Sequence, residues 1–146
     1  MKLPAGYSWD PALKMGRETA ALTAQVWPNY LFGPSDLPEP GLKFEVSREE
    51  FAKRFPVWGI RRDSNGELVA FANGALVTAD ESGDLPADGW TFAIRSAGDA
   101  NQKNCLCLLS ATVSPAARGL GFAQILIERA KQATRELGYR TMVAPA

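Results

Sequence analysis

The feature that most constrains the fold of this chain is an unbroken succession of strand, glycine turn, helix and strand over residues 105–144. Residues 105–113 are almost wholly apolar, as expected of a strand buried on both faces. Residues 139–144 predict a second buried strand, and a helical crossover between two such strands makes them parallel, with a right-handed connection. Residues 120–137 predict the amphipathic helix of this crossover, with a buried face of Ala123, Leu126, Ile127, Ala130, Thr134 and Leu137.

A second pattern, further upstream, predicts an antiparallel hairpin. Residues 57–62 and 68–77 are strand-like, and Asp63-Ser64-Asn65-Gly66 lies between them. The Asn-Gly pair suits a turn in which both central residues have positive φ. Together with the parallel pair, this hairpin predicts an α/β (α+β) fold with a mixed, mostly antiparallel sheet and flanking helices.

The remaining segments predict helices and loops around this sheet. Residues 12–27 show the helical spacing of apolar side chains, and Ser47-Arg48-Glu49-Glu50 resembles a capping box that opens a short helix. Residues 33–41 and 80–88 combine Gly, Pro and acidic residues, which predicts loops. Residues 89–95 fit a strand and a helical turn equally well.

Composition excludes several classes of function. Lysine plus arginine balances aspartate plus glutamate at 16 each, so bulk nucleic-acid binding has no support. The chain has no histidine, which removes Ser-His and Cys-His nucleophile pairs and the commonest zinc ligand. Cys105 and Cys107 alone make a poor metal site, and we interpret them as small buried hydrophobes in a reducing compartment. We therefore expect no metal centre.

Length and hydropathy indicate one soluble domain. At 146 residues the chain has the size of an ordinary domain with its own core. Residues 1–6 lack the apolar segment of a signal peptide, and no window approaches the ~20 apolar residues of a membrane span. We expect a cytoplasmic protein without membrane contacts.

The glycine turn, Arg118 to Ala123, carries the chemistry that the sequence predicts. The first amides of a helix have no intrahelical partner, and the helix dipole places partial positive charge there, so this is a predicted phosphate site. Gly119 and Gly121 let a phosphate approach the backbone, and Arg118 adds a full charge. A Walker A loop is excluded because no Lys-Ser or Lys-Thr follows, and a dinucleotide fingerprint fails at Gln124.

The pattern Arg118-x-x-Gly121-x-Ala123 resembles the Arg/Gln-x-x-Gly-x-Gly/Ala signature of the GNAT acetyltransferases. The preceding strand end with Val113-x-Pro115 and the amphipathic helix after the turn are also similar to that family, and the resemblance is specific over residues 105–145. It implies a sheet with a central splayed parallel strand pair, and acetyl-CoA or another acyl-CoA as co-substrate. A turn that binds nothing is the alternative.

The resemblance also implies roles for individual residues. The amides of the turn would hold the CoA pyrophosphate, the preceding strand end would bind the pantetheine arm, and residues 141–144 would splay away to open the binding slot. The amide of Val113 would polarise the thioester carbonyl. The residues implied to bind the cofactor are Ala111, Thr112, Val113, Arg118, Gly119, Leu120, Gly121, Phe122 and Ala123.

The resemblance implies an acyltransferase that moves an acyl group from a CoA thioester to the amine of a small molecule or peptide, by direct attack. A non-catalytic acyl-CoA-binding or sensing module with the same fold is the alternative, and a purely structural domain is a third interpretation. Residues 1–146 are expected to form a single GNAT-like domain that lacks the family's usual C-terminal helix and strands. A homodimer is compatible with this interpretation.

No catalytic acid or base can be assigned from the sequence. Tyr7, Tyr30 and Tyr139 are candidate acids that would pack equally well in a core, and the acidic residues of 80–88 would either attract an amine or simply be solvated. Trp58 and Trp90 would line an acceptor pocket or pack in the core.

Because each such acid or base role contributes about 10²–10⁴-fold, residues 1–146 alone are predicted to turn over weakly. Steady-state kinetics with acetyl-CoA would check this, and rapid turnover would contradict it.

Overall fold

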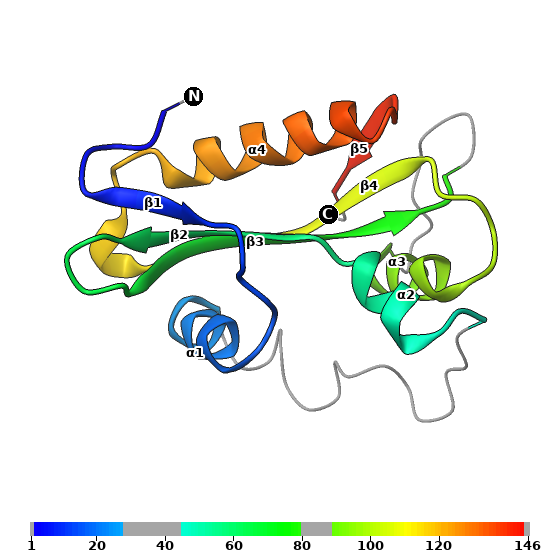
Figure 1. Ribbon diagram of the computed structural model, residues 1–146, viewed down its shortest axis with the longest axis horizontal. Coiled ribbons are helices and arrows are strands. Elements are labelled where there is room, and N and C mark those ends of the chain that lie inside the picture. The colour runs from blue at the N-terminus through cyan, green and yellow to red at the C-terminus, as the bar shows by residue number, and fades with distance from the viewer. Residues whose placement is uncertain (1, 28–44, 80–88, 145–146) are drawn as a thin grey trace.

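The computed structural model describes residues 2–27, 45–79 and 89–144 and contains one five-stranded sheet in the order β1-β2-β3-β4-β5 (Figure 1). Neighbouring strands are antiparallel except β4 and β5, which are parallel. This confirms the predicted mixed, mostly antiparallel sheet with one parallel pair. The strands are β1 Tyr7–Asp10, β2 Val57–Arg62, β3 Leu68–Val77, β4 Cys105–Val113 and β5 Thr141–Val143.

Helices cover both faces of the sheet (Figure 1). The longest helix, α4, lies along one face, and α1, α2 and α3 lie on the other. A short 3-10 helix, Pro115–Ala117, connects β4 to the turn before α4. The helices are α1 Arg17–Val26, α2 Arg48–Lys53, α3 Gly89–Gly98 and α4 Phe122–Glu136.

The buried face of α4 differs in part from the predicted stripe. Leu126, Ala130 and Thr134 are buried as predicted, and Ile127 packs half-buried against the same core. The prediction is wrong for Ala123 and Leu137, which are exposed. Their places are taken by Phe122, Ile125 and Ala133, which are buried against the sheet. Residues 122–127 are apolar at all but one position, so spacing alone could not fix the rotation of this helix.

The helix predicted over residues 12–27 is shorter than expected, because α1 begins only at Arg17. The chain before it turns instead, and buries Leu13 against the sheet. Gly59 makes this possible, since a Cβ there would lie 2.2 Å from Leu13 Cδ2. Leu13 then joins a core cluster with Leu22 and Phe71 that fixes α1 on the sheet.

Three local features of the structure either differ from the sequence prediction or were left open by it. Strand β1 alternates aromatic and polar residues over only four positions, and it was not predicted. Residues 89–95, which the sequence left open, belong to helix α3. The hairpin is present, but Asn65 does not have the positive φ expected of it; only Gly66 does, at 71°. The Ser47 cap is confirmed, because its Oγ accepts a hydrogen bond from the Glu50 amide at 3.1 Å.

Some predictions fall outside the described residues. These include the loops at 33–41 and 80–88, Tyr30 and the side chain of Trp90. Within the described ranges, no helix is long and apolar enough to cross a membrane, and no three potential metal ligands form a group.

The packing of α4 generates a stability prediction. Leu126 is fully buried, so Leu126→Ala is expected to lower the free energy of unfolding by about 2–5 kcal/mol. Leu137→Ala makes the same chemical change at the C-cap of this helix, where the side chain is 47% exposed, and should cost about 1 kcal/mol or less. Denaturant titration of both variants would check this, and equal losses would contradict the observed helix face.

Candidate functional site

Strand β4 is paired along its whole length on one edge and only in part on the other. It pairs with β3 from Cys105 to Val113, but with β5 only through Cys105, Leu106 and Cys107. In the described part of the chain, no strand pairs with the second edge of β4 beyond Cys107. Within the described residues, the second edge of β4 is thus without a partner strand beyond Cys107. We call this stretch of the strand edge the opening, and it is where the resemblance places the binding slot.

Backbone donors of β4 point into this opening. The amide of Ser114 donates to Val69 O at 2.7 Å, on the β3 side. Because successive N–H groups along a strand point to opposite edges, the amides of Val113 and Ala111 point away from β3. Two backbone donors thus lie along this edge at the carboxyl end of the strand, where no strand of the described residues pairs with them.

The glycine turn follows directly. Gly119 has φ 86° and Gly121 has φ 81°, a left-handed region that favours glycine, and Gly121 is the N-cap of α4. No side-chain hydrogen bond caps this helix start, and the turn from Arg118 to Gly121 is exposed. Among the described residues, a Cβ placed on either glycine would meet no atom within 4 Å. The first amides of a 15-residue helix therefore face open space with their partial positive charge.

The predicted cofactor residues differ in what they offer a ligand. Phe122 is buried, with its ring 4.9 Å from that of Tyr7 in an edge-to-face contact, so only its backbone is available to a ligand. Thr112 is also fully buried, and its Oγ1 accepts a hydrogen bond from Trp27 Nε1 at 3.1 Å. Ala123 is exposed beside the turn. Whatever this site binds would be held mainly by main-chain groups, with Arg118 as a nearby cation.

A pocket of about 360 Å³ lies on the α1 side of the sheet, next to the opening. On its sheet side Asn73 and Ser110 are directly paired across β3 and β4, and the Ser110 hydroxyl donates to Asn73 Oδ1. This pair was not predicted, although Asn73 and Ser110 are each a polar residue inside an apolar strand. The lining residues are Met15, Gly16, Thr19, Ala20, Thr23, Ala24, Trp27, Phe71, Asn73 and Ser110.

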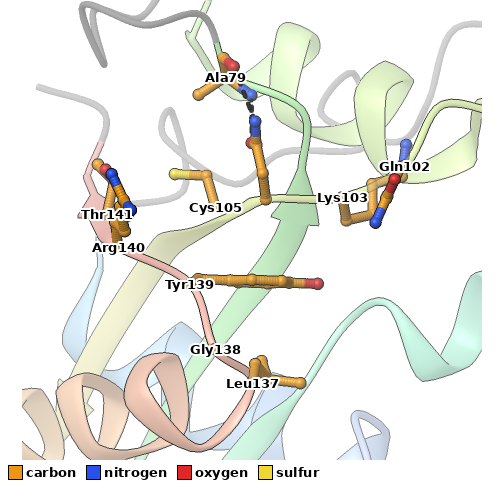
Figure 2. A pocket seen from close by; sticks show the side chains of 10 residues that line it. Ala79, Gln102, Lys103, Cys105, Leu137, Gly138, Tyr139, Arg140 and Thr141 are labelled. Carbon is orange, nitrogen blue, oxygen red and sulfur yellow. Dashed lines mark hydrogen bonds between the residues drawn. The ribbon is translucent and has the colours of Figure 1, made fainter.

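A second pocket, of about 650 Å³, lies at the other end of β4, beside the end of α4 (Figure 2). Tyr139 lines it, and burial raises the pKa of this phenol. Tyr139 lies beside Cys105 at the start of β4, roughly 26 Å along the strand from Val113. This separation removes Tyr139 as an acid for a ligand in the opening, and the ring contact between Tyr7 and Phe122 makes Tyr7 a core residue.

The other candidate side chains also pack in the core. Trp58 lies half-buried against the main cluster, with the Arg129 guanidinium 6.0 Å from its ring centroid. Cys105 and Cys107 are fully buried on the α3 side of the sheet. Burial raises the pKa of both thiols, that of Cys107 to about 12. Neither thiol has the character of a nucleophile.

Comparison with known proteins identifies the family. The family model described as "Acetyltransferase (GNAT) family" matches residues 21–145, and the chain belongs to this family. No functionally curated sequence matches the chain significantly.

One of the similar solved structures supports the fold. An aminoglycoside acetyltransferase from an uncultured soil metagenomic sample superposes with a TM-score of 0.52 at 12% identity, covering 97% of this chain and 78% of its own. A ribosomal-protein-alanine N-acetyltransferase from Brucella melitensis has a TM-score of 0.44 at 19% identity, and the match covers 64% of this chain and 53% of that protein. A Trypanosoma brucei acetyltransferase has a TM-score of 0.45 at 14% identity, and the match covers 64% of this chain and 53% of that protein. The matched part thus spans about half the length of the last two proteins.

Burial of the two cysteines generates a prediction about reactivity. At pH 8 both thiols should stay protonated and react with a disulfide reagent such as Ellman's reagent far more slowly than an exposed thiol. Both should react at once in denaturant, which serves as the control. Fast labelling of the folded protein would contradict the described burial, and loss of acyl transfer in a folded Cys105→Ala/Cys107→Ala variant would contradict their assignment as inert core residues.

Proposed function

We propose that this chain binds an acyl-CoA along the open edge of β4 and the glycine turn, and transfers the acyl group to an amine. The observation that carries the proposal is the continuity of the two sets of backbone donors. Two outward-pointing amides of β4, at Ala111 and Val113, lead directly to the exposed helix start at Gly121. A long ligand with a phosphate group at one end and a carbonyl chain at the other fits this arrangement.

Each part of the cofactor would have its own contacts. The turn amides from Gly119 to Ala123 would hold the pyrophosphate, with Arg118 adding a charge that is not essential. The main chain of residues 111–113 would hydrogen-bond the pantetheine arm. The amide of Val113 would donate to the thioester carbonyl, where it stabilises the negative charge that develops on the oxygen.

The amine would approach from the α1 side, through the pocket that contains Asn73 and Ser110. Its nitrogen lone pair attacks the carbonyl carbon, a C–N bond forms, and the C–S bond breaks to release the CoA thiolate. The nitrogen then loses a proton to solvent, and the thiolate gains one. None of the described residues that line the pocket is ionisable, so they supply neither proton acceptor nor proton donor.

That lack of an ionisable group is also the observation that favours the alternative, a module that binds acyl-CoA without catalysis. The two functions share the cofactor site and differ only in turnover. Release of free CoA that depends on an added amine would establish the enzyme, and binding without any such release would establish the module.

Substitution of the N-cap glycine tests the cofactor site. Gly121→Val is expected to abolish acetyl-CoA binding, because a branched side chain would occupy the space that a phosphate needs and would strain a residue at φ 81°. Gly66→Val is the matched control, since Gly66 has φ 71°, also has open space at its Cβ and lies in the distant hairpin. Calorimetric titration with acetyl-CoA, paired with circular dichroism, would measure both.

The result is informative in each direction. Equal binding by wild type, Gly66→Val and Gly121→Val would place the cofactor elsewhere, and no binding by wild type at millimolar ligand would remove the proposal. Arg118→Ala should weaken binding only roughly fivefold, as expected of an exposed charge. That loss should grow at low ionic strength, where screening is weaker.

A further inference from the structure

The α1 wall of the pocket presents little free polarity, although three of the residues on this wall have polar side chains. Thr19 Oγ1 donates to Gly16 O at 3.0 Å and accepts from Gly16 N at 2.9 Å, and Thr23 Oγ1 donates to Thr19 O at 2.7 Å. Trp27 Nε1 donates to Thr112 at 3.1 Å. These polar atoms already have partners, so the α1 wall offers a ligand mainly methyl groups, a thioether and an aromatic surface.

The available polarity is concentrated at the Ser110–Asn73 pair. Ser110 donates its hydroxyl hydrogen to Asn73 Oδ1, which leaves the lone pairs of the serine oxygen free to accept a hydrogen bond. In the structure the Asn73 amide has its oxygen towards Ser110. Asn73 therefore turns Ser110 into an acceptor, positioned on the strand that borders the opening.

The described lining carries no charged side chain. The acidic residue on the first turn of α1, Glu18, is held by Arg61 with contacts of 2.7 and 2.8 Å. A ligand with several charges would lose hydration in this pocket without gaining an ion pair from the described lining, which is unfavourable. The volume of about 360 Å³ is at the small end of the range for small-molecule sites.

We propose that the acceptor is a small primary amine whose remaining body is apolar and uncharged. This inference rests on the proposed function. The neutral amine donates one N–H to Ser110 Oγ, which keeps the nitrogen lone pair free to attack the thioester. Asn73 is a positioning residue that acts through Ser110, and the apolar body lies against α1.

Phenethylamine is a suitable probe, with spermidine as the polycationic comparison. We expect kcat/KM with acetyl-CoA to be at least tenfold higher for phenethylamine. Ala20→Phe would fill the pocket from an exposed position of α1 and should lower that value at least tenfold, with acetyl-CoA binding unchanged. Ala21→Phe is the matched control, because Ala21 is the next residue, is also exposed and does not line the pocket.

Titration of ¹⁵N-labelled protein with phenethylamine, in the presence of CoA, would report binding even if turnover is slow. Shifts should appear at α1 and Ser110, and Ala20→Phe should remove them. Ser110→Ala should raise KM for the amine, and Ser110→Thr should restore it, because threonine keeps the hydroxyl. Asn73→Ala should have an effect similar to Ser110→Ala, and the double variant should be no worse than either single one.

The outcomes separate this inference from the proposed function. If acetyl-CoA does not bind the wild type, both fail together. If acetyl-CoA binds but spermidine is preferred, or Ala20→Phe behaves like Ala21→Phe, the acceptor class is wrong and the cofactor site stands. Additive losses in the Asn73 and Ser110 variants would overturn the role of Asn73.

Discussion

The rest of the site depends on the unequal pairing of β4. Eight of the nine residues of this strand pair with β3, while β5 pairs with only its first three. Backbone N–H and C=O groups that lose a partner strand must find another partner or water. Within the described residues, the open half of β4 therefore presents a line of main-chain groups that no strand pairs with. This line leads to the turn where the positive-φ glycines precede the start of α4. A ligand that satisfies both sets of groups would complete the sheet edge and the helix start together.

Packing on both faces keeps this edge in place. On one face α4 buries Phe122 and Leu126, which fixes the direction of its N-terminus. On the other face α1 is tied to the sheet by Arg61, which bonds Asp10 at 2.8 Å and Glu18 at 2.7 Å. The hydrogen bonds from Arg61 lower the pKa of both carboxyls. Their contribution to stability is complete above the ordinary carboxyl pKa and is lost as the pH falls through the lowered values.

Sequence patterns were sufficient where the determinants are local. The apolar run of β4, the glycine turn and the long helix were predicted because each is encoded in neighbouring residues. The prediction that α1 begins near residue 12 was wrong, because burial of Leu13 depends on Gly59, a residue more than forty positions away. The rotation of α4 was predicted only in part, since Ile125, Leu126 and Ile127 are equally apolar. The Asn73–Ser110 pair could not be predicted, because it depends on the register between β3 and β4.

The family assignment and the fold are established by the family model and the sheet, whereas the cofactor residues remain a proposal based on main-chain geometry. Their most direct test is titration of ¹⁵N-labelled protein with acetyl-CoA, monitored at each backbone amide. The account predicts the largest shifts at Ala111, Val113 and the turn from Gly119 to Ala123, with no shift at the hairpin residues 63–66. Shifts concentrated instead around Tyr139, at the far end of β4, would contradict it, as would the absence of any shift at millimolar ligand.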